Sequence, residues 1–200
     1  MTGRPRAWAF LFLNTSSFLS PSAPSTRALR EAWQATISAA SPRSSSGLKA
    51  SNGSAKLLYS VIGENAYDDS SGAKRVTEQQ LAAGADIIFG MGDGASFGMI
   101  EAIRDFNDEN EDAPAKFIDV IGDKTNVDKE GVLLSSVVWD FTDIYNQAIE
   151  EVAAGTFGQK GYELTVDNGI SLLRTDNAPA EVWEAIDEAQ AGVADGSIEI

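Results

Sequence analysis

The sequence predicts an α/β fold in which a parallel sheet is covered by helices on both faces. Short apolar runs that suit buried strands recur along residues 57–139, and helix-forming stretches separate most of them. Short links join these segments, as is usual where strands and helices alternate. The chain has 200 residues, of which 43% are hydrophobic and 22% charged, so it is long enough for one domain or two small lobes.

Each predicted element follows from a local pattern. The run 57–62 is apolar and closes at Gly63, and the polar residues that follow can cap a helix. The same order of strand and helix then repeats. The predicted strands cover residues 57–62, 86–90, 117–121 and 132–139, and the predicted helices cover 70–83, 95–106, 141–154 and 179–189. Residues 162–166 and 170–174 are predicted to form a hairpin turned at Asp167-Asn168-Gly169.

The first 45 residues differ in composition from the rest. They are rich in Ser, Ala, Pro and Arg, and their only sustained apolar run, residues 7–13, is too short to span a bilayer. Arg4 and Arg6 precede this run and small residues follow it, which is typical of a weak secretory signal. A transit peptide and a gene-model artefact are alternatives of equal weight. We therefore expect residues 1–45 to be disordered and dispensable.

Charge and composition exclude several classes of function. Residues 1–57 carry a net charge of +6 and the remainder −21, so nucleic-acid binding by residues 58–200 is not expected. The chain has no Cys and no His, which excludes disulfides, Cys–His and Ser–His–Asp sites, and zinc sites built from Cys and His. The acidic residues of 105–112 lack the spacing of an EF-hand. We predict no metal and no cofactor.

Three consecutive predicted strands end in polar loops, at residues 64–69, 90–96 and 122–126. Ligands bind outside the carboxyl ends of strands in such sheets, and an aromatic ring, glycine backbone and carboxylates there suit a neutral, hydroxyl-rich ligand with a flat ring. Taken singly, the same residues have simpler roles as helix caps or turns. The second loop departs from the G-x-G-x-x-G pattern, and Asp93 in it would repel a pyrophosphate.

Five blocks of the sequence, in order, resemble the basic membrane protein (BMP, PnrA-like) family. They are Gly47-Leu48-Lys49-Ala50-Ser51-Asn52, residues 67–74 (YDDSSGAK), residues 84–90 (GADIIFG), Gly92-Asp93-Gly94 and residues 132–138 (VLLSSVV). Members of this family are the substrate-binding lipoproteins of ABC transporters that take up purine nucleosides. The resemblance covers roughly residues 46–200.

The resemblance implies a type I periplasmic-binding-protein fold, with two α/β lobes that close on a ligand. Residues 55–131 would form most of the second lobe and residues 132–200 the returning part of the first, so the two-lobe architecture would be incomplete. It also implies an ABC transporter permease as partner and a place in the cell envelope, on the periplasmic or extracellular face of the plasma membrane. The chain has no cysteine for a lipid anchor.

Site residues follow from the same resemblance. Tyr67 would stack on the purine, with Asp68 beside it. Asp123 would accept hydrogen bonds from ribose hydroxyls, with Asp119 as a rival. Trp139 stands where many members have lysine, which removes a cationic donor. The candidate ligand-binding residues are Tyr67, Asp68, Gly92, Asp93, Gly94, Asp119, Asp123 and Trp139.

The sequence therefore predicts a non-enzymatic solute-binding protein for a nucleoside-like ligand, with no catalytic residues. An alternative is a doubly wound α/β enzyme that uses Asp93 and Asp123 as acid–base groups on a sugar or nucleotide. A further alternative is a truncated product that folds poorly.

Overall fold

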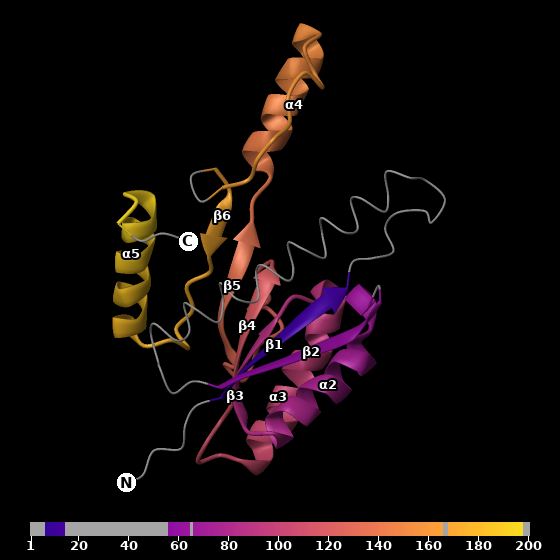
Figure 1. Cartoon of the computed structure of the whole chain (residues 1–200), viewed down its shortest axis with the longest axis vertical. Coiled ribbons are helices and arrows are strands. Elements are labelled where there is room, and N and C mark those ends of the chain that lie inside the picture. The colour runs from indigo at the N-terminus through magenta and orange to yellow at the C-terminus, as the bar shows by residue number, and fades with distance from the viewer. Residues whose placement is uncertain (1–6, 15–55, 65, 166–167, 198–200) are drawn as a thin grey trace.

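The computed structural model describes residues 7–14, 56–64, 66–165 and 168–197. Figure 1 shows its elements. In chain order they are β1 (Ala7–Asn14), β2 (Lys56–Glu64), the 3-10 helix η1 (Ala66–Asp68), α2 (Ser70–Ala82), β3 (Ala85–Gly90), the 3-10 helix η2 (Asp93–Ala95), α3 (Ser96–Glu109), β4 (Lys116–Ile121), β5 (Leu133–Trp139), α4 (Thr142–Ala154), β6 (Ile170–Leu172) and α5 (Ala180–Ala194).

The strands form one sheet in the order β2-β1-β3-β4-β5-β6. The first five strands are parallel, and β6 runs antiparallel to β5. Helices α2 and α3 lie side by side along the sheet (Figure 1). The predicted α/β class with a parallel sheet flanked by helices is therefore confirmed.

Strand β1 lies inside the segment that we expected to be disordered. Its backbone pairs on both sides, with Phe10 opposite Tyr59 of β2 and Phe89 of β3. The expectation is therefore wrong for Ala7–Asn14, and the other residues of 1–45 lie outside the described residues. The physical reason is that a continuous apolar run suits a strand with neighbours on both sides as well as it suits the core of a signal peptide.

The predicted hairpin near the C-terminus is also wrong. Residues 162–165 form no strand, and Ile170–Leu172 pairs with β5 instead, with Ile170 opposite Trp139. Two backbone hydrogen bonds hold β6 beside β5. The Asp140 amide donates to the Gly169 carbonyl at 2.7 Å, and the Leu173 amide donates to the Ser136 carbonyl at 2.8 Å.

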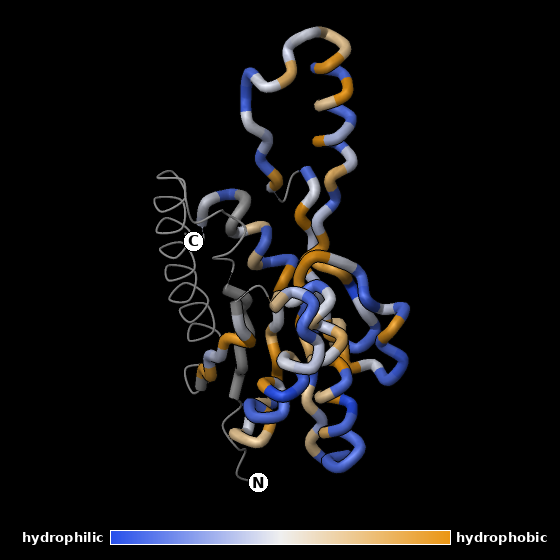
Figure 2. Tube along the Cα trace, turned by 90° about the vertical axis from the view of Figure 1, so that its right-hand side faces the viewer, coloured by the Kyte–Doolittle hydropathy of each residue, from blue (hydrophilic) through white to orange (hydrophobic). Residues whose placement is uncertain are grey.

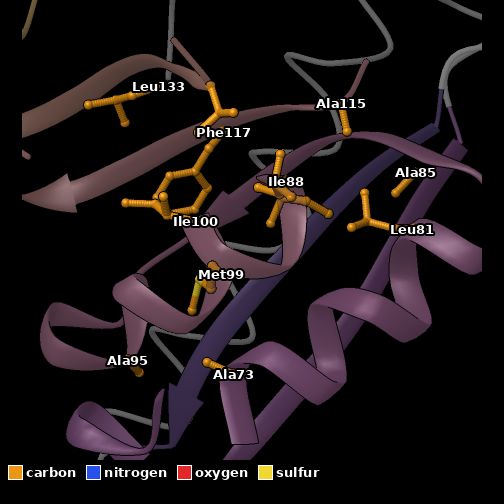
Figure 3. Packing of buried hydrophobic residues seen from close by; sticks show 12 residues of the cluster. Ala73, Leu81, Ala85, Ile88, Ala95, Met99, Ile100, Ala115, Phe117 and Leu133 are labelled. Atoms are coloured by element: carbon orange, nitrogen blue, oxygen red, sulfur yellow. The ribbon is translucent and has the colours of Figure 1, made fainter. Parts of the chain in front are cut away.

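The core lies between the sheet and helices α2 and α3. Ile88 of β3 and Phe117 of β4 are paired in the sheet and fully buried, and they pack with Met99 of α3 (Figure 3). Ile103 of α3 belongs to the same buried cluster. Helix α2 begins where the Asp69 carboxylate accepts a hydrogen bond from the Gly72 amide at 2.8 Å. This cap fixes the start of α2 beside the end of β2.

Helix α4 departs from this packing. It projects away from the sheet (Figures 1 and 2) and contains no buried residue. It ends at Gly155, whose φ of 71° is the left-handed conformation common at helix C-termini. The chain returns from it through residues 156–169 to β6.

Candidate functional site

The candidate site lies at the carboxyl edge of the parallel strands. In the order β2-β1-β3-β4-β5, the chain places β2 on one side of β1 and then continues with β3 on the other side. The strand order therefore reverses between β1 and β3. Such a switch point is where open α/β sheets bind ligands, because the loops on its two sides diverge and leave a crevice. Residues 91–95, which follow β3, therefore lie beside the expected binding position.

The loops after β2 and β3 are joined. The Ser70 hydroxyl, at the start of α2, donates to the Gly94 carbonyl at 3.3 Å. A Cβ atom added to Gly94 would lie 2.5 Å from Asp68 Oδ1 and 3.4 Å from the Tyr67 carbonyl oxygen. The structure thus brings the predicted residues Tyr67, Asp68 and Gly94 together, with Tyr67 half-buried and Asp68 exposed.

The glycine-rich loop holds Asp93 in an unusual conformation. Asp93 is exposed and has a φ of 47°, in the left-handed region that Asp tolerates better than most residues. Gly92 is buried, and a Cβ added to it would lie 2.9 Å from the Ser96 amide nitrogen. The loop is therefore tightly folded under Asp93, whose carboxylate faces solvent.

A buried polar cluster supports two of the loops from below. Asp119 of β4 is 0% exposed. It accepts a hydrogen bond from the Ser96 hydroxyl at 2.8 Å, and Lys124 Nζ lies 2.7 Å from its other oxygen. Burial raises the pKa of Asp119, while Lys124 and Ser96 oppose that rise. Asp119 is thus placed to hold α3 and the loop after β4, rather than to reach the surface.

Ser136 of β5 adds a buried hydroxyl to this polar cluster. It lies opposite Asp119 in the register of the two strands and is 0% exposed. Within the described part of the chain, its Oγ has no hydrogen-bond partner.

Asp123 and Lys124 are adjacent in the chain, but Lys124 is buried and Asp123 is exposed. Asp123 is exposed and accepts hydrogen bonds from the amide of Thr125 at 2.8 Å and from its hydroxyl at 2.6 Å. The Thr125 hydroxyl and amide lower the pKa of Asp123. Asp123 is therefore a charged hydrogen-bond acceptor at the edge of the sheet, two positions along from the switch point.

Trp139 lies apart from the first two loops. It ends β5, is 37% exposed, and contacts Phe141 edge to face, with ring centroids 6.3 Å apart. Four strand spacings of about 4.8 Å separate β2 from β5, so roughly 19 Å of sheet edge lies between Tyr67 and Trp139. The candidate residues thus form a row along the edge, with Asp93 and Asp123 between the two aromatic side chains.

Sequence reasoning missed Ser96 and Lys124. Lys124 lies five residues from Asp119, next to an apolar strand, which is a weak signal for a buried ion pair, but Ser96 carries no such signal. Among the described residues, no group of acidic side chains is arranged to hold a metal ion. None of the described helices is long and apolar enough to cross a membrane.

Comparison with known proteins adds a family match. The sequence model of the family described as ABC transporter substrate-binding protein PnrA-like matches residues 38–182. No curated protein matches the chain.

Solved structures share the fold at low sequence identity. An ABC transporter solute-binding protein from Conexibacter woesei is 19% identical, with a TM-score of 0.57, over 99% of this chain and 57% of that one. A protein from Bacillus halodurans described as a transcriptional activator of the comK gene is 18% identical, with a TM-score of 0.58, over 96% and 57%. GanP, a glucose-galactose binding protein from Geobacillus stearothermophilus, is 12% identical, with a TM-score of 0.51, over 88% and 55%. The chain thus spans little more than half the length of these proteins.

Proposed function

Because the chain belongs to the PnrA-like family of ABC transporter substrate-binding proteins, we propose that it binds a purine nucleoside at the carboxyl edge of its sheet. The observation that carries the proposal is the junction of the loops after β2 and β3, where Ser70 bonds Gly94 next to Tyr67 and Asp68. This junction lies beside the switch point of the sheet, and it holds the backbone of Tyr67 close to Gly94.

The proposed roles follow from chemistry and position. Tyr67 stacks on the base, because an aromatic ring binds the face of any base. Asp93 and Asp123 accept hydrogen bonds from ribose hydroxyls, since both carboxylates are exposed and neither is held in a buried ion pair. Trp139 offers a second aromatic surface at the far end of the row.

A binding role fits the Asp123 carboxylate better than catalysis does. A general acid at neutral pH needs a raised pKa, whereas the pKa of Asp123 is lowered by Thr125. Asp123 is therefore a charged acceptor that fixes hydroxyl groups without donating a proton to them.

We also propose the setting of this activity. The chain is the solute-binding component of an ABC transporter, acts with its permease, and lies outside the plasma membrane or in the periplasm. Residues 55–131, together with β1, belong to one lobe. Residues 132–200 first complete the same sheet with β5 and β6, and α4, which projects from it, extends toward another lobe.

Calorimetric titration of the chain tests the proposal, with adenosine, guanosine and inosine compared with glucose and galactose. Nucleosides are expected to bind weakly, near millimolar, because contact with a single lobe would supply only about half of ~10 kcal/mol of binding free energy. Tyr67→Ala should weaken nucleoside binding by on the order of 1–3 kcal/mol, whereas Tyr67→Phe should not.

The remote exposed aromatic Phe157 provides a matched control, because Phe157→Ala removes a ring far along the projecting region. Equal affinities of the wild type and Tyr67→Ala would remove Tyr67 from the site. Tighter binding of glucose or galactose than of every nucleoside would show that the ligand of this site is a sugar rather than a nucleoside.

A further inference from the structure

The described chain contains two pairs of aspartate followed by glycine. One is Asp93-Gly94, in the loop after β3, and the other is Asp195-Gly196, after α5. In such a pair the glycine nitrogen can attack the carboxyl carbon of the preceding side chain, because glycine has no Cβ atom that shields its amide. Since both pairs have the same two residues, the fold decides which of them reacts.

The side chain of Asp93 is not restrained. It is exposed, and its carboxylate forms no hydrogen bond or ion pair within the part of the chain that the structure describes. Gly94 is the second residue of η2, and the first amides of a helical turn have no partner inside it. The attacking nitrogen and the carboxyl group that it would attack are therefore both available in the folded protein.

The side chain of Asp195 is held in place. Its Oδ1 accepts a hydrogen bond from the Ser197 amide at 2.9 Å. The hydroxyl and the amide of Ser197 also lower the pKa of Asp195. The attack needs a carboxyl group that is protonated, so that water can leave, and that has turned toward the next amide. Ser197 opposes both conditions.

We propose that Asp93 is a site of spontaneous isoaspartate formation in the folded protein. The Gly94 nitrogen forms a bond to Asp93 Cγ, one bond between Cγ and a carboxyl oxygen breaks, and the hydroxyl leaves with the amide proton as water. The product is a succinimide ring. Solvent water then adds to the backbone carbonyl of Asp93, and the ring opens with the proton returned to the nitrogen. The chain now runs through Cγ, without oxidation and without a net change of mass.

Isoaspartate at position 93 lengthens the backbone by one methylene group inside a tightly folded loop. The Ala95 amide donates to the Gly92 carbonyl at 2.8 Å, across Asp93, and the Ser70 hydroxyl donates to the Gly94 carbonyl at 3.3 Å. The longer linkage lies between or beside the partners of both bonds, so we expect both to break. Isomerisation thus separates the loop after β3 from the start of α2.

Prolonged incubation of the full chain tests this proposal, independently of any ligand. Samples are kept at physiological temperature, either folded or in concentrated urea. Trypsin places the two pairs on separate peptides, residues 76–104 and 175–200, and electron-transfer mass spectrometry distinguishes isoaspartate from aspartate. In the folded chain, Asp93 should isomerise at least about tenfold faster than Asp195, because Asp195 must first lose its hydrogen bond from Ser197. In urea the two rates should be equal.

Gly94→Ala shields the attacking nitrogen and should slow isoaspartate formation at Asp93. Its Cβ would lie 2.5 Å from Asp68 Oδ1, the end of a side chain that can move aside. Gly196→Ala is the matched control, and it should leave the rate at Asp93 unchanged. Circular dichroism verifies the fold of both variants. The proposal is overturned by a folded chain in which Asp195 reacts as fast as Asp93, or in which no isoaspartate forms at position 93.

A consequence for binding rests on the proposed function. Nucleoside binding should fall in proportion to the isoaspartate content at position 93, because Asp93 and its loop belong to the proposed site. Fresh protein that binds no nucleoside would contradict the proposed function, whereas the peptide analysis would still decide whether Asp93 isomerises. Incubated protein that binds nucleosides as well as fresh protein does would place the loop after β3 outside the site.

Discussion

Asp119 and Lys124 illustrate how one ion pair can position a binding edge. Asp119 is fully buried and Lys124 is 8% exposed, so water screens their attraction weakly. Asp119 also holds Ser96 at the start of α3. One carboxylate therefore sets the loop that carries Asp93 and the loop that carries Asp123 relative to each other.

Lys124→Met should destabilise the protein by about 3–5 kcal/mol, because it leaves a buried carboxylate without a cation. For a chain of this length, that corresponds to a fall of roughly 6–20 °C in the thermal midpoint. The double variant Asp119→Asn/Lys124→Met should recover most of the loss, since no buried charge then remains. Differential scanning calorimetry measures all three proteins. A double variant no more stable than Lys124→Met would show that packing, not charge, holds this loop.

The loss in Lys124→Met should also depend on pH. Burial already raises the folded-state pKa of Asp119 above its unfolded value, and removing Lys124 raises it further. An acid whose pKa is raised by folding stabilises the folded state while it is protonated, and that contribution disappears as the pH rises through the folded pKa. The deficit relative to wild type should therefore be smaller near pH 4 than near pH 7.

At the scale of elements, the contact between α2 and α3 depends on a glycine. A Cβ atom added to Gly98 would lie 1.9 Å from the Ser70 carbonyl oxygen, at the first residue of α2. Because that atom is backbone, the helices must separate to make room. The same pair of helices carries the loops of the candidate site, so their spacing also sets the width of the site.

Gly98→Ala should cost about 1–3 kcal/mol, the usual range for overpacking a tight contact. Gly161→Ala is the control, because a Cβ there would meet nothing within 4 Å. Urea denaturation compares the two variants with the wild type. Equal stability of Gly98→Ala and the wild type would mean that the two helices can separate at little cost.

The outer part of α4 is stabilised by the bond between Glu151 and Tyr162. Tyr162, followed by Gln147 and Lys160, lowers the pKa of Glu151, and Glu151 raises the pKa of Tyr162. The contribution of Glu151 is thus present above its unfolded pKa and is lost as the pH falls through its folded pKa. The contribution of Tyr162 is lost only as the pH rises through its own raised pKa.

Tyr162→Phe should move the pKa of Glu151 back toward its usual value, because the phenol is the strongest of its hydrogen-bond donors. A carbon-13 NMR titration of the Glu151 carboxyl measures this directly. Lys160→Met is the comparison, since it removes a weaker partner at 3.3 Å and should shift the pKa less. A larger shift in Lys160→Met would show that the charge of Lys160, rather than the hydrogen bond from Tyr162, is the main cause of the lowered pKa of Glu151.

At the scale of the whole molecule, β1 joins the two parts of the sheet. It lies between β2 and β3, so among the described strands β2 is linked to the rest of the sheet through β1. Deletion of residues 1–14 should therefore abolish cooperative thermal unfolding, and deletion of residues 1–6, which leaves β1 intact, should not. Calorimetry with circular dichroism measures both. Two deletions with the same transition would show that β1 is dispensable.

Local sequence patterns predicted the elements of residues 56–154 well, because apolar strands and capped helices such as α2 are specified by their own residues. The family resemblance is likewise confirmed by the match over residues 38–182. β1 was missed because its partners begin at Lys56 and Ala85, far along the chain. The hairpin failed because a turn signal at residues 167–169 does not reveal that β5 offers a better partner.

The candidate site was predicted only as a set of loops. Parallel strands end at one edge, so Tyr67, Asp93 and Asp123 could be assigned to the same edge from sequence. Which side chains turn inward could not, because it depends on packing. Asp119 and Lys124 are buried and Asp123 is exposed, although the three lie within six residues.

The central place of β1 also has a consequence for biosynthesis. β1 leaves the ribosome before the two strands that flank it, which end only at residues 64 and 90. At a translation rate of about 5–20 residues per second, its second edge waits roughly 4–15 s for a partner. During that interval the backbone hydrogen-bonding groups of an apolar strand are unpaired, and other nascent chains can pair with them. Production of this protein should therefore respond to chaperones that shield nascent segments, and to slower or faster translation of its first half.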